Sequence, residues 1–134
     1  MVVDSDGRAY VGSLGFDLRG GAPASNTNLV VVSPHGTVSI AAEGLGFPNG
    51  GVITPDGKTF VLAESFANRL TAFDINGGAL INRRTWAQFG PVPTTTDALQ
   101  LLAEIDVSAD GICMDSEGAI WLTNPPRKRV LRAP

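Results

Sequence analysis

Two polar side chains stand directly before glycines at the start of apolar runs: Asn49 in "PNGGVI" and Asp110 in "ADGICM". Asn49 offers a neutral amide oxygen and Asp110 a charged carboxylate, and both are hard oxygen ligands of the kind that calcium or magnesium prefers. A divalent metal held there would polarise a carbonyl group or lower the pKa of a bound water. Asn-Gly and Asp-Gly are also common tight-turn pairs, so the alternative is that both residues only shape turns.

The remaining candidates for catalysis do not form a group. The chain has one cysteine, Cys113, and one histidine, His35. Cys113 alternates with acidic and apolar neighbours in an expected strand, which predicts a small buried hydrophobe. His35 lies in a turn, "SPHGT", from which no Ser/His/Asp or Cys/His arrangement can be argued. A single cysteine also excludes an internal disulfide.

Short hairpins are the elements that would position Asn49 and Asp110. The chain contains 16 glycines and 9 prolines, a density that suits many short strands better than long helices. An apolar run, a turn with glycine and a second apolar run recur four times, with Gly7, Gly36, Gly57 and Gly118 in the turns. The predicted strands are 1–4, 8–13, 28–33, 37–42, 51–54, 59–64, 69–75, 80–88, 111–115, 119–123 and 129–132.

These strands group in fours, at a period of roughly 45 to 60 residues that is typical of β-propeller blades. A β-sandwich is the alternative for evenly spaced hairpins. The predicted fold class is all-β, a single partial propeller domain of about 2.5 to 3 blades of four antiparallel strands. Its expected parts are a blade over 1–45, a blade over 46–90, an insertion over 91–109 and a partial blade over 110–134.

The insertion carries the one helical pattern. In "TDALQLLAEI" apolar residues follow at helical spacing after an N-cap candidate, Thr96 or Asp97, so a short helix is predicted within 96–105.

In a propeller the innermost strands line the channel, and Asn49 and Asp110, about 60 positions apart, each stand at the entry to such a strand. The two side chains could therefore meet at one ion.

Composition narrows the class of protein. Apolar residues make up 43% and charged residues 17% of the 134 residues, which is enough for a folded core. The net charge of −3 lacks the basic excess of nucleic-acid binders, so no nucleic-acid partner is expected. No signal-peptide pattern begins the chain, and no apolar run approaches the roughly 20 residues of a membrane span. We therefore expect no membrane partner and a cytoplasmic location.

Four stretches together resemble the gluconolactonase/regucalcin (senescence-marker-protein) family: "GRAYVG", "FPNGGVITPDGKTFVLAESFANRLTAFDI", "NRRTWAQFG" and "DGICMDSEGAIWLTNPPRKRVLR". Their motifs stand in the family's order, and the resemblance covers nearly the whole chain apart from the insertion over 91–109. It implies a six-bladed propeller with one divalent metal in its central channel. We expect calcium, with zinc or magnesium as alternatives, and hydrolysis of sugar lactones or related esters.

Carried over to this sequence, the resemblance makes Asn49 and Asp110 metal ligands and Asp110 also the catalytic base. The family's glutamate ligand near its N-terminus and the asparagine of its Arg-x-Asn-Asp motif have no counterpart in this sequence. The substrate-binding candidates are three. Ser13 stands where close relatives often have asparagine, and Asp17 stands near the position at which family members place a substrate-contacting acid. Glu64 ends a strand and could face the pocket or satisfy a backbone amide.

Three functions stay open at this point. The first is a metal-dependent hydrolase of the sugar-lactone type, or an incomplete piece of one, with a small lactone or sugar acid as its partner. The second is a self-associating binding or scaffold module, a homo-oligomer whose copies complete a ring, because a closed propeller needs at least about four blades. The third is a non-catalytic folded fragment with exposed apolar blade faces.

Overall fold

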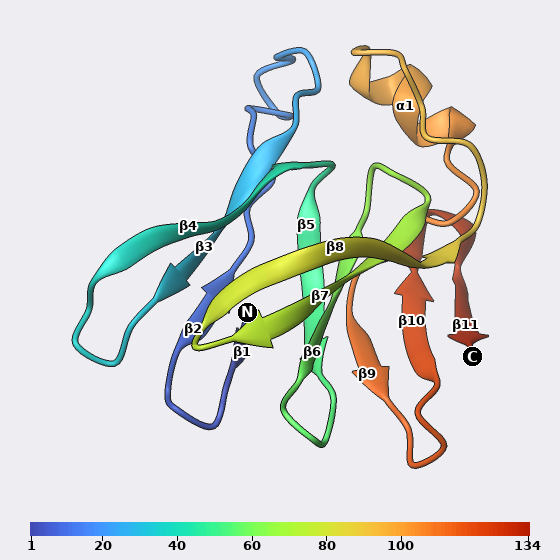
Figure 1. Cartoon of the computed structure of the whole chain (residues 1–134). Helices are drawn as coiled ribbons and strands as arrows, with labels where there is room; N and C mark the ends of the chain where they lie inside the picture. Colours follow the sequence, from blue (N-terminus) through green and yellow to red (C-terminus); the bar gives the residue numbers. More distant parts are fainter.

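The computed structural model describes residues 1–134, in which three antiparallel sheets follow one another along the chain (Figure 1). The first sheet contains β1 (Val2–Val3), β2 (Ala9–Val11), β3 (Thr27–Val32) and β4 (Val38–Leu45). The second contains β5 (Pro48–Ile53), β6 (Thr59–Glu64), β7 (Arg69–Asn76) and β8 (Ala79–Gln88). The third contains β9 (Ile112–Met114), β10 (Ile120–Asn124) and β11 (Arg129–Ala133). Every predicted strand forms, with ends shifted by a few residues.

Each sheet begins with the same kind of hairpin. A carboxylate in the turn accepts backbone N–H groups of the following residues: Asp4 accepts from Arg8 at 2.8 Å, Asp56 from Lys58 at 3.1 Å and Asp115 from Ala119 at 3.0 Å. Such side-chain bonds fix a tight turn locally, before any tertiary contact forms. All four predicted turn glycines, Gly7, Gly36, Gly57 and Gly118, have the positive φ that the turns require.

The sheets pack side by side, with two cores between them. One core joins the first and second sheets, where Tyr10 stacks on Phe60 with ring centroids 5.2 Å apart. The other joins the second and third sheets, where Val61 and Leu70 belong to the same cluster as Ile120. Because the innermost strands β1, β5 and β9 are neighbours, the three sheets have the arrangement of successive propeller blades.

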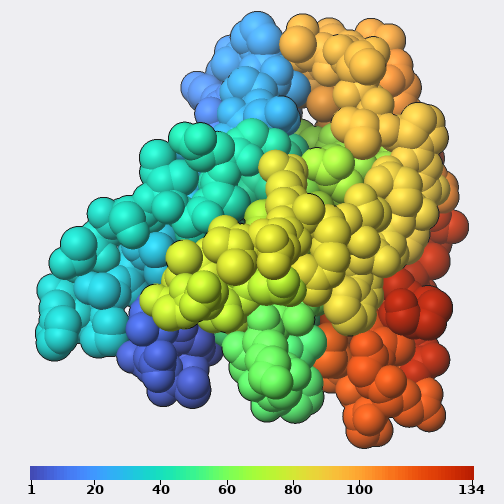
Figure 2. Space-filling model, in the orientation of Figure 1, coloured from blue at the N-terminus to red at the C-terminus, as the bar shows by residue number.

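A cap of loop and helix covers one end of the sheets. Helix α1 (Ala98–Glu104) begins at Asp97, whose carboxylate accepts a hydrogen bond from the Gln100 backbone at 2.8 Å, so the predicted helix and one of its two cap candidates are confirmed. Leu101 and Ile105 are buried against Phe66. Figure 2 shows the loop before β3, in blue, touching the insertion, in orange, at this end.

The outer faces of the first and third sheets stay uncovered. Val3, Val38 and Ile40 are exposed on the first sheet, and Trp121 and Val130 on the third. Cys113 lies on this third-sheet face and is exposed, so the prediction of a buried thiol is wrong. The reason is that Ile112 and Met114 turn toward the second sheet, and strand alternation places Cys113 on the other side. No helix has the length and apolar character needed to cross a membrane.

Candidate functional site

A pocket of about 180 Å³ at the capped end brings Asn49 and Asp110 into one lining. Its four polar lining residues are Asn49, Ser65, Ser108 and Asp110. The other six are apolar or proline: Leu18, Phe47, Phe66, Leu102, Pro125 and Pro126. They come from β5 and the residues just before it, the β6–β7 loop, the cap, the segment before β9 and the turn after β10. Segments distant in sequence therefore converge here.

Gly50 explains why Asn49 and Asp110 come together. Its backbone N–H donates to the Asp110 carbonyl at 3.0 Å, which joins the entry of β5 to the segment before β9. A Cβ atom at position 50 would lie 2.3 Å from that carbonyl oxygen and 2.9 Å from the Ile112 nitrogen. No side chain fits in that space, so glycine is required for the close approach of the two backbones.

The tight-turn interpretation of "PNGG" is wrong. Asn49 and Gly50 lie within β5, where the register with β6 shifts between Pro48 and Gly51. Gly50 has no positive φ; Phe47 has one, at 53°. The second glycine of the motif thus permits backbone contact rather than a hairpin turn.

Asp110 and Gly111 are likewise no hairpin turn, because they pair with β10. The Asp110 N–H donates to the Thr123 carbonyl at 3.0 Å, and the Thr123 N–H donates to the Gly111 carbonyl at 3.0 Å. These two bonds extend the pairing of β9 with β10 and fix the backbone that carries the Asp110 carboxylate.

The oxygens of the two candidate ligands are unoccupied by protein donors. Asn49 uses its Nδ2 to donate to Ser65 Oγ at 3.2 Å, and no protein group donates to its Oδ1. The half-buried Asp110 side chain forms no hydrogen bond or ion pair. No lysine, arginine or histidine lines the pocket, so nothing in the lining neutralises the carboxylate.

The chemistry of this donor set fits part of a hard-cation site. Carboxylate and amide oxygens suit calcium, which takes about 6 to 8 oxygen ligands. Nowhere in residues 1–134 do three or more histidine, cysteine, aspartate or glutamate side chains gather in a metal-binding group. This pocket therefore offers two side chains with ligand oxygens, Asn49 and Asp110. A complete coordination shell needs further oxygens from water or from another segment.

Ser13 and Asp17 lie outside the pocket lining. Ser13 Oγ is 3.2 Å from Thr27 Oγ1, and the Asp17 carboxylate accepts from the Gly20 backbone at 2.8 Å, in an exposed loop. Leu18, the neighbour of Asp17, does reach the pocket. The structure therefore gives Asp17 a local turn contact, outside the lining to which its neighbour Leu18 belongs.

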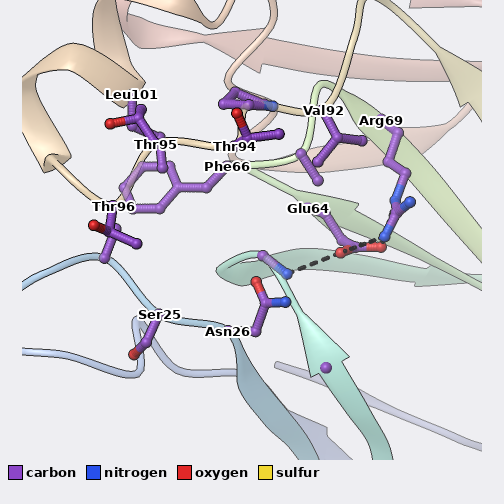
Figure 3. Close-up of a pocket in the computed structure, with 15 residues that line it drawn as sticks. Ser25, Asn26, Glu64, Phe66, Arg69, Val92, Thr94, Thr95, Thr96 and Leu101 are labelled. Carbon is purple, nitrogen blue, oxygen red and sulfur yellow. Dashed lines mark hydrogen bonds and ion pairs between the residues drawn. The ribbon is translucent and has the colours of Figure 1, made fainter.

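Glu64 lies in a different, larger pocket of about 320 Å³, drawn in Figure 3. Its carboxylate is 0% exposed and accepts from Gly46 N at 2.9 Å and from Arg69 Nε at 2.8 Å. Thr71 Oγ1 and Arg83 Nη2 donate to the same carboxylate at 2.5 and 3.2 Å. Burial raises the pKa of Glu64, but the hydrogen bonds from Arg69, Thr71 and Gly46 outweigh it and hold the pKa below its ordinary value.

Two hydroxyl groups of the site were missed by sequence reasoning. Ser65 and Ser108 are 2% and 7% exposed and both line the pocket. Only their places in the sequence could have indicated them. Ser65 follows the strand that ends at Glu64, and Ser108 stands two residues before Asp110. Serine is common in loops for local reasons, so that signal alone is weak.

Comparison with known proteins gives a consistent set of relatives. A family model described as SMP-30/Gluconolactonase/LRE-like region matches residues 1–133. The chain is 28% identical to pentonolactonase XacC of Haloferax volcanii over 123 residues, 90% of this chain and 36% of that protein. It is 27% identical to regucalcin of Danio rerio over 132 residues, 97% of this chain and 40% of that protein. The chain thus spans about two fifths of the curated relatives it matches.

Solved structures agree on the fold. A luciferin-regenerating enzyme aligns with a TM-score of 0.75 at 20% identity, over 97% of this chain and 39% of its own. A gluconolactonase from Xanthomonas campestris aligns with a TM-score of 0.66 at 24% identity, over 98% of this chain and 44% of its own. A regucalcin from Agrobacterium tumefaciens, described as a calcium-binding protein, aligns with a TM-score of 0.65 at 20% identity. The alignment covers 91% of this chain and 36% of that protein. These likenesses confirm the predicted all-β class with propeller-type blades.

Proposed function

The chain belongs to the SMP-30/Gluconolactonase/LRE-like family, and from this premise we propose that it is the ligand-bearing part of a metal-dependent hydrolase acting on sugar lactones. One observation carries the proposal: Asn49 and Asp110, from different sheets, line one pocket with their oxygens free of protein donors. A curated relative is a pentonolactonase and a structural relative is a gluconolactonase, which supports a lactone as the substrate class.

Asn49 and Asp110 would hold the metal, for which calcium is the first choice and magnesium or zinc the alternatives. When bound, such a metal acts as a Lewis acid toward the lactone carbonyl. Asp110 is the catalytic base: its carboxylate takes a proton from the attacking water, whose oxygen bonds to the carbonyl carbon. The ring C–O bond then breaks and its oxygen receives the proton, which gives the open hydroxy acid.

The other proposed residues lie around this pocket. Phe47, Phe66 and Leu102 contribute apolar surface to the lining beside Asp110. Ser13 and Asp17 lie in or beside the loop that delivers Leu18, and we propose them as outer contacts for substrate hydroxyls. Glu64 has no free oxygen for a substrate, and we assign it to the fold instead.

The test is calorimetric titration of the chain with calcium, followed by a lactone hydrolysis assay with and without the metal. We expect calcium binding that Asp110→Asn and Asn49→Ala each weaken by at least tenfold. Glu43→Gln serves as the control, because Glu43 is exposed and its side chain has no partner. Binding that survives both site variants would contradict the proposal. Calcium binding without turnover would limit the chain to ligand binding.

A second candidate function, self-association into a ring, rests on the uncovered sheet faces. Tyr10 and Trp121 occupy equivalent positions, two residues after Arg8 and Ala119, whose carbonyls close their hairpins. Tyr10 stacks on the next sheet, whereas Trp121 is 42% exposed. The outer face of the first sheet in a second copy would offer Trp121 an apolar surface, in which the small Ala9 lies between Val3 and Val32 and exposed Val38 pairs with Val32.

Solution mass decides this second candidate. A homo-oligomer of this kind would have at least twice the monomer mass in light scattering, and Trp121→Asp or Ile40→Asp would return it to a monomer. A monomeric mass for the unmodified chain at high concentration would exclude the ring of copies.

A further inference from the structure

Ser65 touches both segments that carry the candidate ligands. Its Oγ accepts a hydrogen bond from Asn49 Nδ2 at 3.2 Å and donates one to the Ala109 carbonyl at 2.5 Å. Ala109 directly precedes Asp110 and is 0% exposed. One buried hydroxyl, 2% exposed, therefore links the Asn49 side chain to the backbone next to Asp110.

The direction of these hydrogen bonds fixes how the Asn49 amide lies. A serine hydroxyl has one proton and two lone pairs. Its proton is used on the Ala109 carbonyl, which can only accept, so the same oxygen can only accept from Asn49. The amide must then turn its NH₂ group to Ser65, which leaves Oδ1 on the opposite side of the amide, free of protein donors.

Ser65 itself is held rigidly. Its backbone N–H donates to the Phe47 carbonyl at 3.0 Å, and the Phe66 N–H donates to the Gly46 carbonyl at 3.0 Å. These bonds tie the loop after β6 to the residues that lead into β5. The backbone that carries the hydroxyl is therefore fixed, and the hydrogen bond to the Ala109 carbonyl holds the side chain on it.

We propose that Ser65 is a positioning residue that turns the Asn49 amide so that its oxygen, not its nitrogen, is offered to a cation. The proposal rests on the metal-binding part of the proposed function. A reversed amide would direct two N–H donors at the cation and lose the ligand. Partners that orient metal ligands in this way are typically worth about 10- to 100-fold in metal affinity.

The orientation is tested in the metal-free chain by NMR. We expect nuclear Overhauser contacts between the Asn49 Hδ2 protons and the Ser65 Hβ protons, with slowed exchange of one Hδ2 proton. Ser65→Ala should abolish the slow exchange. Asn49 amide protons that exchange freely in the unmodified chain, with no contact to Ser65, would overturn the proposal whatever the metal does.

The consequence for binding is tested by calorimetry with calcium. Ser65→Ala should raise Kd by about 10- to 100-fold, and should have no further effect in an Asn49→Ala background. Ser25→Ala, an exposed serine at the larger pocket, is the matched control and should leave Kd unchanged. An unchanged Kd in Ser65→Ala would overturn the positioning role and leave the proposed function intact. No calcium binding by the unmodified chain would overturn both the proposed function and the role of Ser65 in metal binding.

Discussion

Two carboxylates near the capped end of the molecule have opposite surroundings. Glu64 is fully buried and accepts from Gly46, Arg69, Thr71 and Arg83. Asp110 is half-buried and lines a pocket without a basic residue, and its carboxylate accepts no hydrogen bond from the protein. A carboxylate whose lone pairs are filled stabilises the fold, whereas one left open is available to a ligand. From this difference we propose a structural role for Glu64 and a functional role for Asp110.

The largest expected effect comes from removing the Glu64 carboxylate. Glu64→Ala leaves Arg69 and Arg83 without their shared acceptor and the Gly46 N–H without a partner. Because both arginines are partly exposed and can turn to water, we expect a loss of about 3 kcal/mol in the free energy of unfolding, at the low end for a broken buried pair. Urea denaturation measures it, with Glu43→Gln as the control. A loss below about 1 kcal/mol would remove the structural assignment of Glu64.

Gly50→Ala should come next. The added Cβ meets the Asp110 carbonyl at 2.3 Å, so the two backbones must separate at a cost of about 1 to 3 kcal/mol. Gly111→Ala is the matched control, since a Cβ there meets only Thr123 Oγ1 at 3.7 Å. Equal stability of the two variants would show that close approach at position 50 is not what joins the segments.

The pH dependence of stability should separate the two carboxylates further. The pKa of Glu64 is lowered from its ordinary value of 4.5, so its contribution is present above that pH and is lost as the pH falls through the folded-state value. The difference in unfolding free energy between the unmodified chain and Glu64→Gln should therefore narrow below about pH 4.5. A difference that stays constant down to pH 3 would contradict the lowered pKa.

The smallest effect on stability is expected at the Asp110 carboxylate. Asp110→Asn removes a charge that no protein group pairs, so the free energy of unfolding should change by no more than about 0.5 kcal/mol. The same substitution should nevertheless weaken calcium binding, which calorimetry detects. A large stability loss would place Asp110 with Glu64 as a structural carboxylate.

Much of the fold was predictable because its signals are local. Turn glycines such as Gly57 and Gly118 and the Asp97 helix cap act within a few residues, so spacing alone locates hairpins and α1. The exposure of Cys113 was not predictable in this way. Alternation along a strand separates two faces, but which face is covered depends on the neighbouring sheet.

The candidate site was predicted only in part for the same reason. The resemblance paired Asn49 with Asp110, and the structure places both in one pocket. The Asn-Gly pair suggests a turn as the alternative, because sequence shows that Gly50 lacks a side chain but not which backbone approaches it. Ser65 was missed because its role depends on two hydrogen bonds to residues 16 and 44 positions away.

Paramagnetic broadening by manganese(II) tests the central claim most directly. Mn²⁺ is a divalent ion that favours oxygen ligands, and it broadens the NMR signals of nuclei near it. We predict that substoichiometric Mn²⁺ broadens the signals of Asn49 and Asp110 first, leaves those of the hairpin carboxylates Asp56 and Asp115 at the opposite end of the sheets sharp, and is displaced by calcium. Broadening centred on Asp56 or Asp115, or spread evenly over the exposed carboxylates, would contradict the proposal that the Asn49–Asp110 pocket is the functional site.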